Sequence, residues 1–223
     1  MNVTAKSVKI AALILLCIAA LLPIVVSNAN AATTYVTLRI KYTSKWNLLA
    51  QTENSANGWV NQGGGIYCLS FYPNGSLLDH AAYTTSPYKY GKYTYTQVDS
   101  TDGGLRGQCV DFIKALSMRQ DVPTRGNTYN RWKKGDKVMT STAIALGTAI
   151  ATFDGTGQYY GHCAFFAGWD SGKTGFKVYD QNWGPLYNRV NGGGVVGKHF
   201  IYKTGLTFVS NANNYYIVEV PAN

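Results

Sequence analysis

The segment that decides the fold is residues 107–117, which read GQCVDFIKALS. Its apolar residues, from Phe112 to Leu116, recur at the spacing of one helix face, and polar residues stand between them. Pro123 follows and is incompatible with a helix that continues. The pattern predicts a helix over residues 109–119, the clearest helix signal in the chain.

After this helix the sequence changes to the pattern of strands. Short runs rich in β-branched and aromatic residues alternate with Gly, Asn and Ser turns, which is typical of an antiparallel sheet. We expect strands at residues 145–153, 162–169, 176–179, 198–204 and 215–220. Before the helix, the same alternation predicts strands at 34–42, 65–72 and 84–97. One helix followed by a run of strands predicts an α+β fold.

The N-terminus has the pattern of an export signal. Lys6 and Lys9 precede an apolar run over residues 10–26, and Ala29-Asn30-Ala31 forms a small-residue cleavage site. The alternative is a single membrane anchor, but the run is at the short limit for a spanning helix. We therefore expect residues 1–31 to be a signal peptide. The mature chain is then secreted, periplasmic or at the cell surface, with no stable membrane span.

The mature chain is predicted to have a β-rich extension rich in Tyr, Thr and Gly (32–102), followed by a catalytic domain (103–223). The whole chain has 20 Lys and Arg and 11 Asp and Glu, so losing two lysines with the signal leaves (20 − 2) − 11 = +7. A basic exported protein is attracted to anionic surfaces such as cell-wall polymers, although the charge could serve solubility alone. No basic run or nucleic-acid module is present, so we expect no nucleic-acid partner.

Three segments carry residues suited to nucleophilic chemistry. Cys109 opens the predicted helix, where the helix dipole and free backbone N–H groups favour a thiolate and an oxyanion. His162 opens a predicted strand and can take the thiol proton and return it to a leaving amine. Asp180 and Asn182 end the next strand, 18 and 20 residues after His162, where either can orient the imidazole. We also expect Gln108 to support the oxyanion.

The cysteine count bears on which thiol is free. Cys68, Cys109 and Cys163 remain after signal cleavage, and an odd count leaves one thiol over. Because side chains alternate along a strand, a His162 that points into the site sends Cys163 to the opposite face. We therefore expect a disulfide between Cys68 and Cys163, which leaves Cys109 free.

These three segments resemble those of the CHAP family of amidases and endopeptidases, within the papain-like group that includes NlpC/P60. The matching pieces read GQCVDF at 107–112, GHCA at 161–164 and DQNW at 180–183. The resemblance covers about residues 103–220 and implies a helix that carries the nucleophile Cys109, packed on an antiparallel sheet. It implies cleavage of amide bonds in peptidoglycan, with His162 as the base. The family usually has Glu where this chain has Asp180.

Other interpretations remain open at this stage. Taken singly, Cys109 could be a core residue and His162 a structural histidine, and His80 and His199 are taken as structural. The tyrosines between residues 83 and 95 could form a sugar-stacking face or pack across strands. A non-catalytic surface-binding protein and an acyl transferase are the alternative functions. We expect no metal or cofactor, because no zinc-ligand spacing occurs; an inhibitor or immunity protein is a possible partner.

Overall fold

A computed structural model of the chain describes residues 34–41, 43–51, 59–63, 66–69, 83–90, 93–100, 107–119, 132–183 and 194–222. The predicted signal peptide, residues 1–31, and His80 lie outside these residues, so both remain predictions. No helix in the described ranges is long and apolar enough to cross a membrane.

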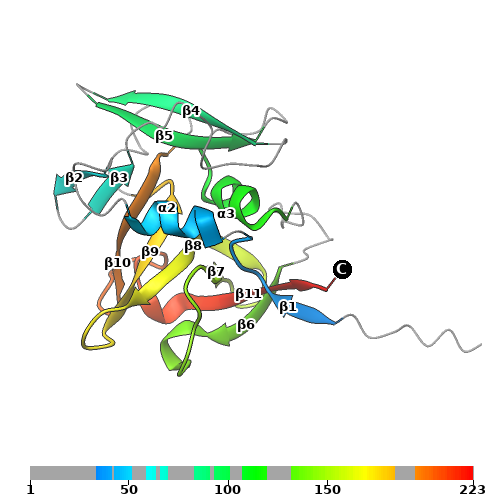
Figure 1. Ribbon diagram of the computed structural model, residues 1–223. Coiled ribbons are helices and arrows are strands. Elements are labelled where there is room, and N and C mark those ends of the chain that lie inside the picture. Colours follow the sequence, from blue (N-terminus) through cyan, green and yellow to red (C-terminus); the bar gives the residue numbers. More distant parts are fainter. Residues whose placement is uncertain are drawn as a thin grey trace, which may run out of the picture. The chain divides into compact units, whose positions relative to one another are not determined.

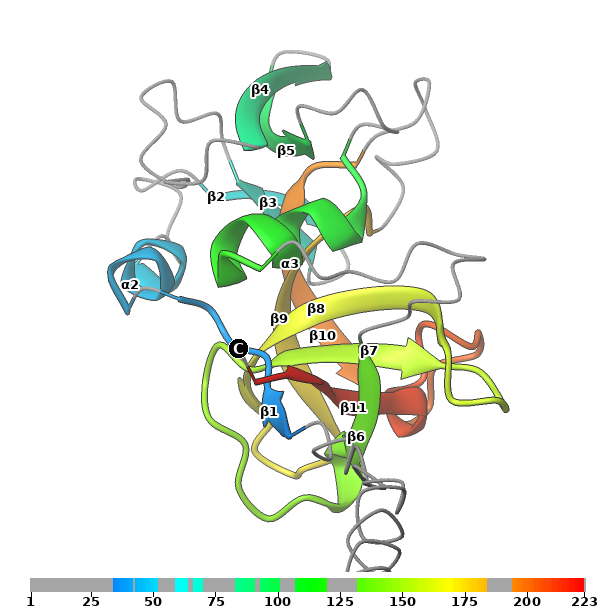
Figure 2. The same cartoon turned by 90° about the vertical axis from the view of Figure 1, so that its right-hand side faces the viewer.

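An antiparallel sheet dominates residues 34–222 (Figures 1 and 2). Its strands follow one another in space as β1, β11, β7, β8, β9, β10, β3 and β2, and β6 pairs with β11 beside this path. The bounds are β1 Tyr35–Thr37, β2 Trp59–Gly63, β3 Ile66–Leu69, β6 Lys133–Lys137, β7 Ala149–Phe153, β8 Tyr159–Trp169, β9 Gly175–Gln181, β10 Val196–Tyr202 and β11 Tyr215–Pro221. A sheet of this kind with few helices agrees with the α+β expectation.

In the described part of the chain, two short helices accompany the sheet. α2 spans Thr43–Gln51 and α3 spans Cys109–Ser117. Two short 3-10 helices lie elsewhere in the chain, at Val138–Thr140 and Ala212–Asn214. α3 packs against β8 and β9 and against β5 of the separate hairpin. Its C-terminus is closed by Met118 in the left-handed conformation, whose N–H donates to the Lys114 carbonyl. The helix predicted at 109–119 is confirmed. The sequence did not predict α2, because the strand expected at 34–42 was followed by no assigned element.

The central strands bury side chains on both faces, and each face has its own core. On the α3 side, Phe112 meets Phe165 of β8 edge-on, with ring centroids 5.7 Å apart. On the other side, Phe166 and Phe176 pack with Tyr215 of β11. Burial of each such ring contributes about 1.5–3 kcal/mol, so the strands that hold the site are firmly fixed.

The segment before α3 is divided between the sheet and a hairpin. β3 extends the main sheet, because Cys68 pairs with Gly197 of β10. The hairpin consists of β4, Tyr83–Tyr90, and β5, Tyr93–Ser100, where a single alternating segment was predicted. Of the predicted tyrosine face, Tyr95 is buried beside Cys68, whereas the β4 side chains lie outside what the structure describes. Tyr95 is thus a packing residue.

The register of three neighbouring strands brings the polar residues of the site together. Ala164 of β8 lies opposite Asp180 of β9, and Val178 lies opposite His199 of β10. Side chains two residues apart on a strand share a face. His162, Asp180 and His199 therefore converge on one face near the end of the sheet that lies beside the start of α3.

Candidate active site

Cys109 is the first residue of α3 and is almost fully buried, with 6% of its surface exposed. Gln108 precedes it in an extended conformation and caps the helix, and its backbone N–H donates to the Asp111 carboxylate at 3.3 Å. Gly107 has a φ of 65°, and a Cβ there would lie 2.5 Å from the Gln97 amide nitrogen. This position therefore requires glycine, and the tight turn directs Cys109 into the protein.

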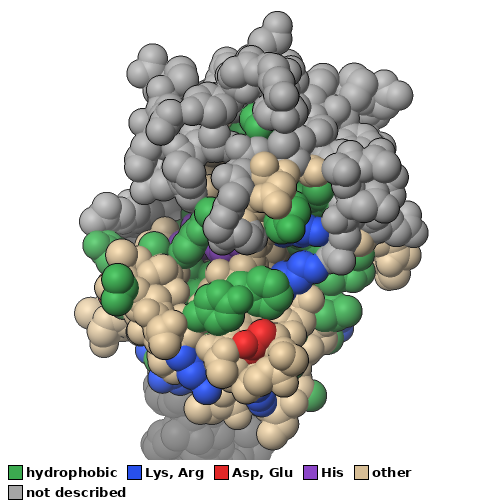
Figure 3. Space-filling view, turned by 90° about the vertical axis from the view of Figure 1, so that its left-hand side faces the viewer, with side chains coloured by type: hydrophobic (Ala, Val, Ile, Leu, Met, Phe, Trp, Pro, Cys, Tyr) green, Lys and Arg blue, Asp and Glu red, His purple; other side chains and the backbone are tan. Residues whose placement is uncertain are grey.

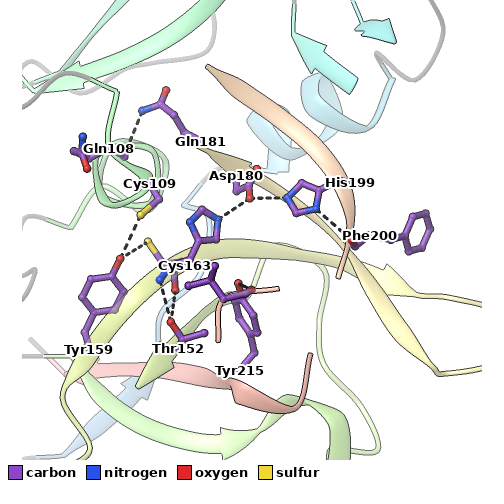
Figure 4. A network of polar contacts seen from close by, with 12 residues as sticks. Gln108, Cys109, Thr152, Tyr159, Cys163, Asp180, Gln181, His199, Phe200 and Tyr215 are labelled. Carbon is purple, nitrogen blue, oxygen red and sulfur yellow. Dashed lines mark hydrogen bonds and ion pairs between the residues drawn. The ribbon is translucent and has the colours of Figure 1, made fainter. Parts of the chain in front are cut away.

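A buried amide ties the start of α3 to its neighbours. Gln181, at the end of β9, donates from Nε2 to the Gln108 carbonyl at 2.9 Å and to the Val98 carbonyl at 2.8 Å. Its Oε1 accepts from the Val98 N–H at 2.6 Å. Because Gln181 directly follows Asp180, one strand end fixes both the helix that carries the cysteine and the carboxylate (Figure 4).

His162 and Asp180 form a direct hydrogen bond inside the protein. His162 Nε2 is 2.6 Å from Asp180 Oδ2, and the two residues are 4% and 0% exposed. With Nε2 bound to the carboxylate, Nδ1 is the ring nitrogen left for the hydrogen bond between His162 and Cys109. On the face shown in Figure 3, only a small area of histidine surface is visible, next to hydrophobic side chains.

The electrostatics favour a charged pair. Burial by itself would lower the pKa of His162, but the negative charge of Cys109 and the hydrogen bond to Asp180 raise it to about 10. A hydrogen bond from Cys163 makes the largest contribution at Cys109, followed in the same direction by the charge and hydrogen bond of His162. These effects outweigh burial and hold the pKa of the Cys109 thiol well below its usual range. Both shifts favour a thiolate and an imidazolium over an uncharged pair.

Two further groups contact the Cys109 sulfur. The Tyr159 hydroxyl lies 3.3 Å from Cys109 Sγ and 3.7 Å from Cys163 Sγ (Figure 4). Burial raises the pKa values of both Tyr159 and Cys163 well above their usual range, so each keeps its proton. The thiolate thus has two neutral donors beside it in addition to His162.

A local distortion of β8 explains why consecutive residues reach one cysteine. Strict alternation would send His162 and Cys163 to opposite faces, yet both interact with Cys109. The β7–β8 register shifts between Ala151 and Phe153, and Gly161 has a φ of 103°. Thr152 fills the bulge, because its Oγ1 accepts from the His162 N–H at 2.9 Å.

The structure corrects one prediction about this site and distinguishes two candidate residues. Cys68 and Cys163 are both free, so the expected disulfide is absent: Cys163 lies beside Cys109, whereas Cys68 packs with Tyr95 and Val195. Of the two residues expected to orient the imidazole, Asp180 lies within β9, whereas Asn182 follows the end of the strand at residue 181 and has a φ of 70°. Asp180 is thus the residue that contacts His162.

Two further predictions concern Gln108 and a metal site. Gln108 caps α3, and its expected support of an oxyanion stays a prediction. Within the described ranges, no three His, Cys, Asp or Glu side chains are grouped so that they could hold a metal ion.

A model of the domesticated amidase effector 2 (Dae2) family matches residues 78–218, more than half of the chain. The chain belongs to the Dae2 family. The Dae2 match includes α3 and all of β7 to β10, and hence Cys109, His162 and Asp180. The family's description as amidases agrees with the enzyme class that the sequence motifs predicted, while the closer resemblance to CHAP and NlpC/P60 stays a prediction.

Comparisons with individual proteins add little to the Dae2 match. A search of curated proteins found no match. Among solved structures, a type 6 secretion amidase effector 2 (Tae2) is 29% identical over 52% of this chain and 83% of its own, with a TM-score of 0.36.

Sequence reasoning missed two polar residues within the Dae2 match. His199 Nε2 lies 2.8 Å from Asp180 Oδ2, and the Trp183 ring stacks on His199 at 4.3 Å. The sequence held a signal for His199, because it stands two residues before the apolar Ile201 in the predicted strand 198–204 and so lies on the same, buried face. No signal distinguished Tyr159, since tyrosine is common in strands.

Proposed function

We propose that this chain is an exported cysteine amidohydrolase that cleaves amide bonds in peptidoglycan peptides. The observation that carries the proposal is the contact series from Cys109, at the start of α3, through His162 to Asp180. Membership of an amidase family supports it. The papain-like assignment rests on the same arrangement, a helix with an N-terminal cysteine beside strands that carry histidine and acid.

The first half of the reaction follows from this geometry. The Cys109 thiolate attacks the carbonyl carbon of the amide, and a tetrahedral intermediate forms with its oxyanion near the backbone N–H groups at the start of α3. His162 then gives its proton to the leaving amine as the C–N bond breaks. Asp180 keeps the imidazole in the useful tautomer and stabilises its positive charge throughout.

The second half removes the acyl group from the sulfur. Neutral His162 takes a proton from water, the resulting hydroxide attacks the thioester carbon, and the Cys109 thiolate leaves. The carboxylic acid product is released, and the thiolate–imidazolium pair is restored. An amine in place of water would give acyl transfer by the same steps, so the product distinguishes hydrolysis from transfer.

Charge and the N-terminal sequence support an extracellular polymer as substrate. The predicted mature chain carries a net charge of +7, and Lys and Arg cover more of the surface in Figure 3 than Asp and Glu do. Peptidoglycan and its associated polymers are anionic, so this balance favours their binding. The signal peptide predicted at 1–31 would deliver the enzyme to that substrate.

Digestion of purified peptidoglycan tests the proposal. Mature wild-type protein, Cys109→Ala and Cys68→Ala are each incubated with peptidoglycan of several chemistries, and soluble fragments are identified by mass spectrometry. Cys68→Ala is the matched control, because it removes a buried free thiol outside the site. We expect peptide release by wild type and Cys68→Ala only. Binding without release by all three proteins would favour a non-catalytic surface-binding protein.

A further inference from the structure

His199 contacts the site but has no part in the steps proposed for Cys109, His162 and Asp180. It lies on β10 and is 3% exposed. Its Nε2 is 2.8 Å from Asp180 Oδ2, the same oxygen that His162 Nε2 approaches to 2.6 Å (Figure 4). One carboxylate oxygen thus receives hydrogen bonds from imidazoles on both neighbouring strands. The other oxygen, Oδ1, accepts none from any described residue.

Contacts with Asp180, the Phe200 carbonyl and the Trp183 ring fix the orientation of the His199 ring. Its Nδ1 lies 3.2 Å from the Phe200 carbonyl, and the Trp183 ring stacks on it at an interplanar angle of 17°. Trp183 also packs against His162, with centroids 5.0 Å apart. Both nitrogens of His199 therefore face oxygen atoms, Nε2 the Asp180 carboxylate and Nδ1 the Phe200 carbonyl. The ring is therefore built to donate to Asp180.

We propose that His199 is a positioning residue for the amidase reaction: it holds Asp180 ionised and oriented, so that Asp180 can fix His162 toward Cys109. This inference rests on the proposed function of Cys109 and His162. It extends the contact series by one residue, which touches neither the substrate nor the reacting sulfur.

The physical reason is the cost of a buried carboxylate. Asp180 is fully buried, and an ionised carboxylate without donors is strongly unfavourable there. Burial raises the pKa of Asp180, but the charge of His199 and the hydrogen bonds from both histidines outweigh burial and bring it to about 2. Without His199, the carboxylate would depend on His162 alone. A protonated Asp180 would no longer stabilise the His162 imidazolium.

The other ionisable groups near Asp180 do not compete for this role. Cys68 on β3, Cys163 on β8 and Tyr215 on β11 also feel the charge of Asp180, and burial is the first cause that raises their pKa values. These groups are neutral around pH 7. A change in the acid midpoint of Cys109 alkylation therefore reports on Cys109, His162 and Asp180.

Two substitutions separate a positioning role from a structural one. His199→Phe keeps a ring to stack on Trp183 but cannot donate, whereas His199→Gln places a neutral N–H donor at similar reach. We expect kcat for peptide release to fall about 10- to 100-fold in His199→Phe, the range for loss of a hydrogen bond to a charged group. KM should change less than about twofold, and His199→Gln should recover most of the loss.

A second readout needs no substrate. The rate of Cys109 alkylation by iodoacetamide is measured against pH, and its acid midpoint reports formation of the thiolate–imidazolium pair. We expect this midpoint to rise by about one pH unit in His199→Phe and by less in His199→Gln. If wild type proves inactive on every peptidoglycan, this shift still supports the role of His199, while the proposed function fails.

Two results would overturn the inference. One is a folded His199→Phe with the wild-type midpoint. The other is an equal loss of activity in both variants that parallels a loss of thermal stability, which would assign a structural role. If His199→Phe does not fold, His199→Asn replaces it, because the shorter amide does not reach Asp180.

Discussion

Replacing Asp180 with asparagine should slow the reaction by about 100- to 10,000-fold in kcat. The carboxylate accepts hydrogen bonds from two buried imidazoles, at 2.6 Å from His162 and 2.8 Å from His199. A hydrogen bond to a charged group contributes about 1.5–3 kcal/mol, or about 10- to 150-fold, and the upper part of this range sets the lower limit because the His162 bond is short and fully buried. An asparagine N–H that faces His162 also selects the wrong tautomer, which raises the loss toward 10,000-fold.

The assay is the initial rate of peptide release from peptidoglycan by wild type, Asp180→Asn and Asp136→Asn. Asp136→Asn makes the same change of charge at an exposed position on β6 and serves as the control. We expect the control to keep wild-type kcat and KM. An Asp180→Asn variant that folds and retains kcat within about fivefold of wild type would refute the reasoning, because the carboxylate would then be dispensable.

Further predictions concern the thiolate, the pH range and the fold. Cys163→Ala removes a donor to the Cys109 thiolate, so the acid midpoint of Cys109 alkylation should rise; an unchanged midpoint would contradict this. Activity should be lost in acid as the thiolate is protonated, at a pH well below that of an ordinary thiol, and lost again near pH 10, where His162 deprotonates; initial rates across a buffer series check both limits. Phe112→Ala should lower the free energy of unfolding by about 3–5 kcal/mol in denaturant titrations, since the ring is fully buried. Gly161→Ala should cost about 1–3 kcal/mol and reduce activity, because φ is 103° and the new Cβ would lie 2.8 Å from Val209; equal stability of wild type and variant would oppose the proposed bulge.

Local patterns in the sequence predicted what depends on short range. The helix that begins at Cys109 and the later strands, β7 to β11, follow from spacing and turn residues. The hairpin spacing of His162 and Asp180 also follows, because β8 and β9 are consecutive and antiparallel. These features place three of the site residues without knowledge of the rest of the fold.

Features that depend on long-range pairing could not be predicted. Cys68 lies in β3, which pairs with β10 more than a hundred residues later in the chain. The sequence therefore could not show that Cys68 and Cys163 are too far apart for the predicted disulfide. The end of β9 at Gln181 and the left-handed backbone of Asn182 could not be predicted from strand alternation either. The irregular β7–β8 pairing next to Gly161 likewise could not be predicted from strand alternation.

The most direct test of the account is the relative reactivity of the three free cysteines in the folded protein. Mature protein is exposed briefly to iodoacetamide at neutral pH, and peptide mapping gives the alkylation rate at each thiol. Cys109 should react faster than a free cysteine, while Cys68 and Cys163 stay unlabelled, because burial raises the pKa of Cys68 to about 12 and that of Cys163 well above its usual range. A Cys109 rate no faster than that of a free cysteine, or preferential labelling of Cys163, would contradict the assignment of Cys109 as the nucleophile.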